Sequence, residues 1–390
     1  MACYISSNDN RFYAAVEASY GKVPAITAGN YFSGIKLSAK QRAQPVDRRD
    51  KTGTRSFVGL PARLRRETSF EVKSYLSAWT NPAQAPPLDP FLQGALGGAP
   101  LSFAGGILAG NSDSRTLRFA AAHNLASGQA VTFGGEIRFV ATVINTTSVQ
   151  LNAPLTILPS AGSPIGPAVT YPPATALRGV SVFDYWGPAN AVQRIVSGAA
   201  VDEMRVKING DFHELRFKGP ARDIVDSASF ESGLGGLTSY PTEPTPGDLD
   251  YSIVPGNLGQ VWLGTNPDQF YTITEGEVVL ANDIETRNRD FGSDLPFCIV
   301  PGQRSVTVNF ALYEQGANQT KELYQAARQR SPISVMLQLG EQPGQMMGIY
   351  LKSVVPEVPE YDDSERRLQW RFTDSRAQGT FNDEIMIAFG

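Results

Sequence analysis

The sequence Ser305-Val-Thr-Val-Asn-Phe-Ala-Leu-Tyr-Glu314 places an apolar side chain at every second position. This period of two residues predicts a β-strand with one buried face. Residues 318–330 then place Leu323 and Ala327 on one helical face and end before Pro332, which predicts a short helix. Six further segments alternate like the first, so we predict a mainly β chain with antiparallel sheets. These segments are 69–76, 131–141, 203–208, 214–217, 333–339 and 367–372.

The composition fits a folded chain of more than one domain. Its 390 residues correspond to roughly two or three domains of about 150 residues. Hydrophobic residues make up 42%, enough to form cores, whereas charged residues make up only 18%, which argues against long solvated helices. The 34 basic and 38 acidic residues form no basic block, so tight binding of nucleic acid is disfavoured.

The sequence contains no recognisable export or membrane segment. Its first residues, MACYISSNDNRFY, lack the basic and apolar regions of a signal peptide. No stretch reaches the about 18 consecutive apolar residues that a membrane helix needs, so we expect no membrane anchor. The two cysteines, Cys3 and Cys298, are too few for a disulfide framework and fit a reducing compartment.

Two parts of the chain repeat one pattern. A shift of 240 residues pairs Phe70 with Phe310 without changing the strand phase, and a shift of 155 residues pairs Phe217 with Phe372. A second candidate helix at 88–96 gives the first part its own counterpart of 318–330. We therefore predict two antiparallel β-sandwich or barrel domains, each with one short helix. The first comprises residues 1–97 and 180–229, and the second comprises 235–390.

The two shifts differ by about 85 residues, which predicts an insertion in the first copy. We place it at 98–179 and predict a small β module, because residues 116–158 alternate. Its Gly/Ala/Ser-rich start and its Pro-rich end at 164–173 are typical of linkers, so the module is expected to lie outside and to be dispensable for assembly. A further Gly/Pro/Ser-rich segment at 233–247 separates the two copies.

Chemistry-bearing residues are scattered rather than clustered. His123 and His213 are each isolated in sequence, which favours structural roles over catalysis or metal binding. The acidic run 357–365 lacks the spacing and glycine of a calcium loop and is interpreted as a solvated turn between strands. No Gly-rich phosphate loop with Lys and Ser/Thr is present. We therefore predict a protein that is not an enzyme and has no cofactor and no metal.

The order of elements in the second half resembles a known family. The predicted order is a strand at 275–284, a long loop at 287–301, the strand 305–313 and the helix 318–330, followed by strands at 333–339, 347–355 and 364–373. Together with the phrase Arg366-Arg-Leu-Gln-Trp-Arg-Phe-Thr-Asp374, this order resembles the tail-tube fold of long-tailed bacteriophages, which the inner tubes of contractile tails and type VI secretion share. The resemblance covers about 120 residues of the second half, and less clearly the first domain.

The resemblance implies a structural virion protein. Family subunits form rings whose inner hairpins join into one β-barrel, and the rings stack into a tube that conducts DNA during ejection. Because most family rings hold six domains, a chain with two would form a trimeric, pseudo-sixfold ring. Further implied partners are tape-measure, tail terminator and tail-tip proteins, with DNA passing through without tight binding. The implied location is the virion tail, after assembly in the host cytoplasm.

Strand phase selects the residues that would face the channel. A channel for DNA should be polar but not strongly basic, because firm phosphate contacts would hold the DNA. The predicted channel-facing residues are Lys36, Ser38, Ser69, Glu71, Lys73, Glu277, Thr307 and Asn309. The apolar residues predicted to lie buried behind them are Phe70, Val72, Val308, Phe310 and Leu312.

Two alternatives stay open at this point. A carbohydrate-binding or adhesin-like β-sandwich array would need exposed aromatic platforms, whereas the four tryptophans mostly occupy strand patterns suited to cores or interfaces. Another tail or baseplate ring component, such as the ring that joins the tube to the tip, would share the predicted fold.

Overall fold

The computed structural model describes residues 4–390 apart from 45, 47–48, 61–63, 80, 111, 188–190, 246–251, 271–272, 315–317 and 365. Within these residues the chain forms 28 strands and two α-helices. The predicted mainly β fold with antiparallel sheets is confirmed. Cys3 lies outside the described residues. In the described part of the chain, no helix is long and apolar enough to cross a membrane.

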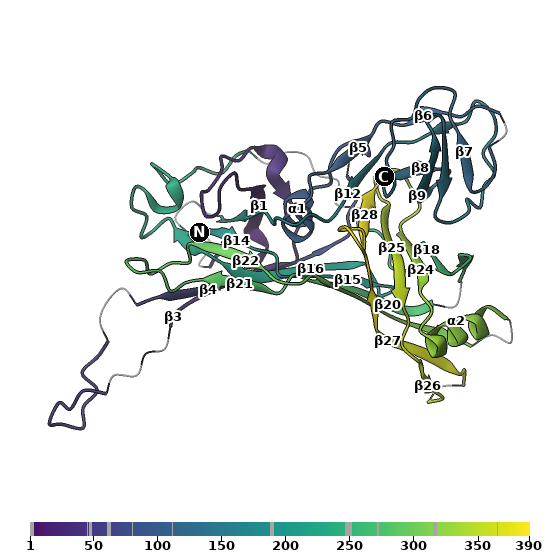
Figure 1. Ribbon diagram of the computed structural model, residues 1–390. Helices are drawn as coiled ribbons and strands as arrows, with labels where there is room; N and C mark the ends of the chain where they lie inside the picture. Colours follow the sequence, from purple (N-terminus) through teal and green to yellow (C-terminus); the bar gives the residue numbers. More distant parts are fainter. Residues whose placement is uncertain are drawn as a thin grey trace.

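Eight antiparallel strands lie side by side in one row. Their spatial order is β3-β4-β16-β15-β20-β23-β27-β26, and they belong to the largest sheet of the described residues. We call this set the eight-strand row. Its strands are β3 (Lys36–Ala43), β4 (Arg66–Tyr75), β15 (Glu203–Ile208), β16 (Glu214–Ala221), β20 (Ile273–Ala281), β23 (Ser305–Tyr313), β26 (Glu360–Asp362) and β27 (Gln369–Ala377). In Figure 1 the strands labelled β4, β16, β15 and β20 lie below α1 (Asp89–Leu96) and β1 (Asn10–Val16).

The row consists of two units of four strands with the same order. The first unit is β3-β4-β16-β15 and the second unit is β20-β23-β27-β26. The two phenylalanines that the shift of 240 residues pairs lie in the second strand of each unit, β4 and β23. Arg205 lies opposite Arg216 in the first unit, and their counterparts at a shift of 155, Glu360 and Arg371, lie opposite each other in the second. Strand order and hairpin register therefore repeat along the row.

A five-stranded sheet and helix α1 (Asp89–Leu96) cover the first unit. The strands of this sheet, in spatial order, are β17 (Asp223–Asp226), β14 (Arg194–Ala199), β13 (Val180–Trp186), β1 (Asn10–Val16) and β2 (Tyr31–Phe32). Helix α1 begins with Pro90 in its first turn, where the missing N–H leaves no hydrogen bond unmade. It ends at Gly97, whose φ of +81° is left-handed, and a Cβ there would lie 2.2 Å from the Ala176 carbonyl oxygen. Only glycine fits this end of the helix.

Helix α2 (Asn318–Gln329) and the continuation of the large sheet cover the second unit. The continuing strands are β18 (Gly259–Gly264), β19 (Asp268–Gln269), β24 (Ile333–Leu339), β25 (Met347–Val355) and β28 (Met386–Phe389). The ring of Tyr324 on α2 packs on Trp370, and Tyr361 packs on the same indole, with both pairs of ring centroids 5.6 Å apart. These aromatic contacts seat α2 over the β26–β27 hairpin.

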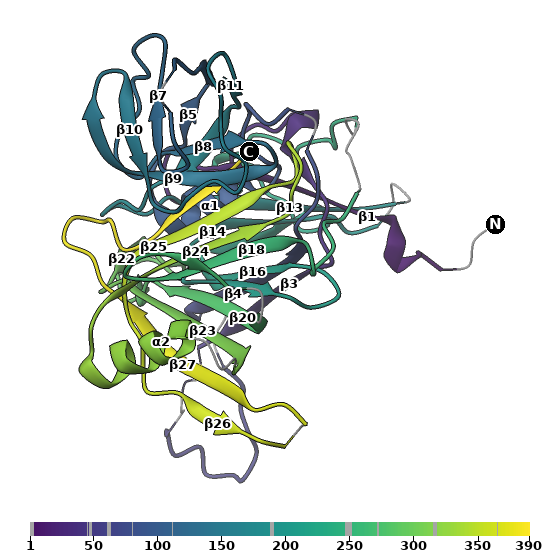
Figure 2. The same ribbon diagram turned by 90° about the vertical axis from the view of Figure 1, so that its right-hand side faces the viewer.

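Residues 98–179, which we call the module, lie mostly at the opposite end of the molecule from that hairpin (Figure 2), and two of its strands belong to the large sheet. Its strands are β5 (Leu101–Phe103), β6 (Gly106–Ile107), β7 (Thr116–Arg118), β8 (Ala130–Phe133), β9 (Glu136–Asn145), β10 (Ser148–Leu151), β11 (Pro164–Ile165) and β12 (Ala168–Tyr171). Strand β12 pairs with β28 on one side and β5 on the other. The interpretation of 164–173 as a linker is therefore wrong, because a distant strand supplies pairing that the local composition does not reveal.

A buried charge links the module to β18, one of the strands that cover the second unit. Arg138 Nη2 donates to Glu136 Oε2 at 3.0 Å and to Gln260 Oε1 on β18 at 2.7 Å. The guanidinium also lies over the Trp262 ring, 5.0 Å from its centroid. Burial lowers the pKa of Arg138 to about 10, although the negative charge of Glu136 opposes this shift. This fully buried guanidinium is thus held by groups from the module and from β18, and removing one of them would leave a buried charge without its partner.

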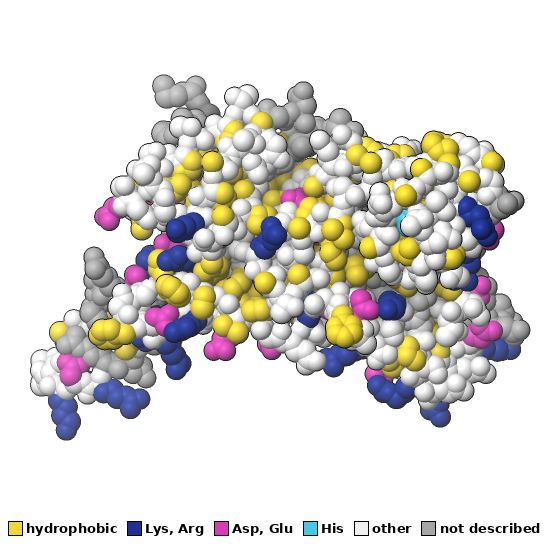
Figure 3. Space-filling view, turned by 45° about the horizontal axis from the view of Figure 1, so that its top comes forward, with side chains coloured by type: hydrophobic (Ala, Val, Ile, Leu, Met, Phe, Trp, Pro, Cys, Tyr) yellow, Lys and Arg dark blue, Asp and Glu magenta, His cyan; other side chains and the backbone are white. Residues whose placement is uncertain are grey.

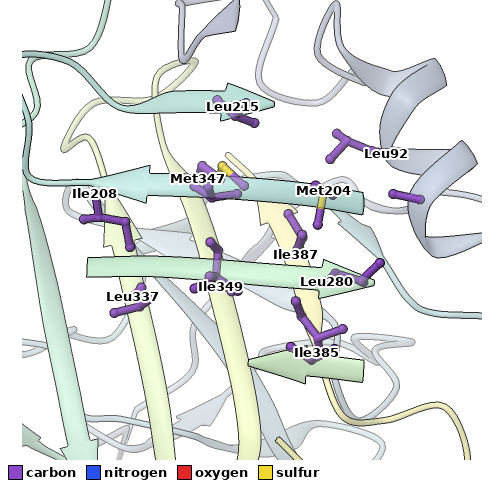
Figure 4. Close-up of a cluster of buried hydrophobic side chains, with 14 of the residues drawn as sticks. Leu92, Met204, Ile208, Leu215, Leu280, Leu337, Met347, Ile349, Ile385 and Ile387 are labelled. Atoms are coloured by element: carbon purple, nitrogen blue, oxygen red, sulfur yellow. The ribbon is translucent and has the colours of Figure 1, made fainter. Parts of the chain in front are cut away.

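The main core lies beneath the place where the two units join. Figure 4 shows side chains from α1, both units and the covering strands pointing toward one another. Among them, Met204 and Leu280 come from the adjoining strands β15 and β20 and are fully buried. The two units therefore share one hydrophobic core rather than having two separate ones.

Three predicted segments differ from the structure. Residues 131–141 are not one strand, because Gly134 and Gly135 adopt positive φ angles and turn β8 into β9. The predicted loop 287–301 includes part of a hairpin formed by β21 (Ile284–Arg287) and β22 (Cys298–Pro301). The predicted strand 364–373 lies later, as β27, because the preceding acidic residues form the separate strand β26.

Candidate functional site

The predicted channel residues lie on one face of the eight-strand row. In the first unit, Lys36 is opposite Lys73 and Ser38 is opposite Glu71, and antiparallel neighbours that lie opposite share a face. Ser69 belongs to the same alternating set of β4. All five side chains are exposed or half-buried. We call this side of the row the polar face.

The second unit continues the polar face. Glu277 lies opposite Asn309 and also opposite Lys207 of the first unit, and Thr307 follows two residues from Asn309. The five apolar residues predicted behind this face, on β4 and β23, are at most 5% exposed. The strand phase thus agrees with the prediction at both units, and whether the face lines a channel stays a prediction.

Charged residues of β15 and β16, which the sequence prediction does not include, complete the polar face. Arg205 of β15 donates to Glu277 of β20 over 3.0 Å, and Lys218 Nζ lies 2.9 Å from a Glu203 carboxylate oxygen. The alternation of 203–208 fixes their phase in the sequence. The sequence could not show that β15 lies beside β20, because that neighbourhood links residues about 70 positions apart.

Glu71 is the centre of the ion pairs in the first unit. Arg216 Nε lies 3.1 Å from one carboxylate oxygen of Glu71, and Lys73 Nζ lies 3.8 Å from the same oxygen. Partial burial would raise the pKa of Glu71, but the hydrogen bond from Arg216 and the nearby lysine charges outweigh it and lower that pKa. Glu71 therefore stays ionised and offsets the basic side chains around it.

The polar face of the second unit carries fewer charges near its centre. Thr307 and Asn309 face outward together with Val279 and Ala281. Asn309 Oδ1 accepts a hydrogen bond of 2.7 Å from the Asp374 backbone N–H, at the irregularity between β23 and β27. This side chain thus satisfies a backbone group that the regular ladder would otherwise have paired.

Across the described part of the polar face, basic and acidic side chains nearly balance. The basic ones are Lys36, Lys40, Arg42, Lys73, Arg205, Lys207, Arg216, Lys218, Arg371 and Arg376. The acidic ones are Glu67, Glu71, Glu203, Glu214, Glu275, Glu277, Glu360 and Asp362. Such a surface offers polar contacts without the concentrated positive charge that holds phosphates.

The row has two unpaired edges within the described residues. Strand β3 pairs only with β4, and strand β26 pairs only with β27, so each presents a free side to solvent. A free edge exposes backbone N–H and C=O groups that can pair with another strand. These two edges lie at opposite ends of the row.

The two histidines have structural surroundings. His213, expected at a turn or strand surface, is instead 1% exposed, and its Nε2 lies 3.1 Å from the Leu258 carbonyl oxygen. Burial lowers the pKa of His213, although that hydrogen bond opposes the shift. His123 Nδ1 accepts from the Leu125 N–H at 2.8 Å, so its Nε2 donates to the Asn145 carbonyl at 2.9 Å. Among the described residues, no group of His, Cys, Asp and Glu is arranged to hold a metal ion.

No protein-family model matches the chain, and no curated protein is significantly similar to it.

Proposed function

We propose that this chain is a structural virion protein that assembles through the two edges of the eight-strand row into rings of a phage tail tube. In this proposal the polar face lines a β-barrel channel that conducts DNA during ejection. The observation that carries the proposal is the joint inside the chain: the last strand of the first unit, β15, pairs with the first strand of the second, β20.

The internal joint is a template for a joint between chains. It pairs six residues of β15 with six of β20 and closes over the shared core. The corresponding free strands are β26, the last of the second unit, and β3, the first of the first unit. A surface that joins last strand to first strand is heterologous, and repeating it closes a ring when the rotation per unit allows.

Closing the row removes both free edges and produces a channel. Barrels of about 16 strands already leave an aqueous channel, and diameter grows with strand number. Three chains with eight strands each would therefore enclose a wider opening. This trimeric ring of six units is the arrangement that the tail-tube resemblance implies.

The polar face suits passage of DNA without tight binding. Its ion pairs neutralise most basic groups, so a passing phosphate backbone would release few counterions and bind weakly. The proposal assigns no catalytic activity and no cofactor to the chain. Its remaining partners would be tape-measure, tail terminator and tail-tip proteins, and its location the virion tail after assembly in the host cytoplasm.

Negative-stain microscopy of the purified chain tests this proposal. We expect rings of uniform diameter with a stain-filled centre, and stacks of such rings at higher concentration. Light scattering after size exclusion should give a mass of three chains for the single ring. A protein that stays monomeric at every concentration tested would overturn the proposal.

The alternatives make different predictions for the same experiment. Another tail or baseplate ring component would give rings that do not stack. A carbohydrate-binding or adhesin-like array would give glycan binding without rings, and here Trp79, Trp262 and Trp370 are each at most 7% exposed. Buried indoles cannot serve as sugar-stacking platforms, so this alternative has less support.

A further inference from the structure

We infer that the charges of the two free edges make the chain pair head to tail with a second copy, β26 against β3, and prevent like edges from pairing. This inference rests on the proposed ring, and it adds what selects the direction of assembly. Each edge carries charge of one sign, and the two signs are opposite.

Strand β3 is the basic edge. It carries Lys36, Lys40 and Arg42 and no acidic residue. All three alternate on the polar face, since Lys40 lies opposite Ser69 and Arg42 lies opposite Glu67. Arg42 is paired within the chain, with its Nη2 2.9 Å from Glu67, yet its side chain stays 77% exposed. The outer side of β3 therefore presents positive charge to an incoming strand.

Strand β26 is the acidic edge. Its residues Glu360 and Asp362 lie opposite Arg371 and Gln369 of β27, on the polar face. Tyr361 between them turns the other way and packs against Trp370 and α2. Asp362 lies 3.0 Å from Arg371 Nη2, whereas Glu360 is exposed. An acidic run interpreted from sequence as a solvated turn is thus part of a sheet edge.

The internal joint shows what such charges do when the strands meet. Lys207 of β15 lies opposite Glu277 of β20, and Arg205 donates to the same glutamate at 3.0 Å. Shifting Arg205 and Lys207 by 155 residues gives Glu360 and Asp362, in the matching hairpin register. The joint between two chains, β26 of one copy against β3 of the next, would therefore repeat the internal joint with the charges exchanged. The acidic side chains would come from β26 and the basic ones from β3.

The opposite charges of the two edges disfavour the pairing of like edges. Two copies that met through β3 and β3 would place lysine and arginine against one another, and β26 with β26 would place carboxylates together. Like charges directly opposite each other destabilise a strand pair, and charged edge strands are a known protection against edge-to-edge association. Pairing of unlike edges is the arrangement without this repulsion, and it is the one that continues around a ring.

The test reverses the charge of each edge strand in turn. The basic-edge variant is Lys40→Glu with Arg42→Glu, and the acidic-edge variant is Glu360→Lys with Asp362→Lys. We expect each to raise the concentration needed for ring assembly about tenfold or more, measured by analytical ultracentrifugation at low salt. The variant with all four changes should regain assembly, because the joint between two chains again unites opposite charges.

A matched control separates edge effects from net charge. Lys321→Glu with Arg328→Glu changes net charge by the same amount as the basic-edge variant, on exposed positions of α2. We expect this control to assemble like the wild type. Circular dichroism and thermal melting would show that every variant is folded before assembly is compared.

A second measurement does not depend on variants. Zero-length carbodiimide cross-linking of wild-type rings joins a lysine amine to a carboxylate, so we expect links between Lys40 of one copy and Glu360 or Asp362 of the next. Assembly of both edge variants at wild-type concentrations, or rings without such links, would overturn the charge selection while leaving the ring intact. A wild-type chain that forms no rings would instead overturn the proposed function.

Discussion

The two units of the row share strand order, but the loop after their first strand differs in its surroundings. Residues 44–65 join β3 to β4, and residues 282–304 join β20 to β23, so the loops have nearly equal length. The loop of the second unit folds into the β21–β22 hairpin against the first unit. The described part of the other loop extends away from the body, and residues 51–58 are exposed (Figure 1).

Contacts with the first unit account for this difference. The Ile284 N–H donates to Asp202 Oδ1 at 2.8 Å, just before β15. Arg66 at the start of β4 lies 3.1 Å from Asp294, and its N–H donates to the Asp294 carbonyl at 2.8 Å. The second loop thus folds because a unit lies beside it in the same chain. In the proposed ring, the second unit of the next copy would lie beside residues 44–65.

The loops also differ in charge. Residues 44–65 contain six basic and two acidic side chains, whereas 282–304 contain three basic and four acidic ones. Figure 3 shows Lys and Arg side chains on the extended loop, at the lower left. The acidic residues next to it in the proposed ring would be those of β26. The loop 44–65 therefore carries positive charge like its neighbour β3, and in the proposed ring both would face the acidic β26.

Deleting the module, residues 98–179, should have the largest effect on stability, and we expect it to act on the second unit, against whose cover the module packs. Sequence alone predicts a dispensable decoration, but Ile137 and Phe139 are fully buried against the cover of the second unit. The ring of Phe139 stacks on Tyr350 with centroids 5.4 Å apart. We expect the deletion variant to lose cooperative unfolding in thermal melts. A variant that still forms tubes would show that the module is decoration.

The next largest effect on stability is expected from replacing Phe310, the aromatic residue at the centre of the second unit. Phe310→Ala removes a ring that is 5% exposed and stacked on Phe372 with centroids 4.6 Å apart. We expect a loss of about 3–5 kcal/mol in the free energy of unfolding, from lost burial and a new cavity. Phe70→Ala at the matching position of the first unit should cost a similar amount, measured by denaturant titration. If only one of them is costly, the two units are not equivalent in packing.

Limited trypsin digestion compares the two loops directly. We expect cleavage of the isolated chain within residues 44–65 to be about tenfold faster than within 282–304, because the hairpin must open locally before it is cut. Assembly into rings should slow cleavage of the first loop. Mass spectrometry of early fragments identifies the sites, and equal cleavage of both loops would contradict the structural difference.

The first unit should make a contribution to the pH dependence of stability that the second unit lacks, because His213 corresponds at a shift of 155 to the exposed Leu368. The pKa of His213 is lowered in the folded chain. The unfolded chain therefore takes up a proton first as pH falls below about 6.5, and stability decreases from that pH downward. We expect His213→Gln to flatten this decrease between about pH 7 and 5.5 in urea titrations. An unchanged slope would mean that other groups cause it.

The smallest effect is expected on the polar face. Asn309→Asp keeps the oxygen that accepts from the Asp374 N–H, and its side chain points away from the core. We expect a change within about 0.5 kcal/mol in the free energy of unfolding, measured by thermal melting beside Phe310→Ala. If the aspartate variant were the more damaging of the two, the strand phase would be reversed and the polar face wrongly assigned.

Sequence by itself determined the phase of the strands and the ends of the helices. Alternation placed Phe70 and Phe310 inside and Glu71 and Asn309 outside, because side-chain direction along a strand is a local property with a period of two. The proline and glycine signals around α1 worked for the same reason: they act on the backbone of neighbouring residues.

Only the tertiary structure decided which strands lie side by side. The joint of β15 with β20 depends on residues distant in sequence, which must pay the entropy of loop closure before they gain contacts. The docking of the module depends on Arg138, whose position in a regular alternation gives no sign that its charge is buried. The local sequence pattern thus determined which face of a strand each side chain lies on. Long-range packing determined which residues that side chain contacts.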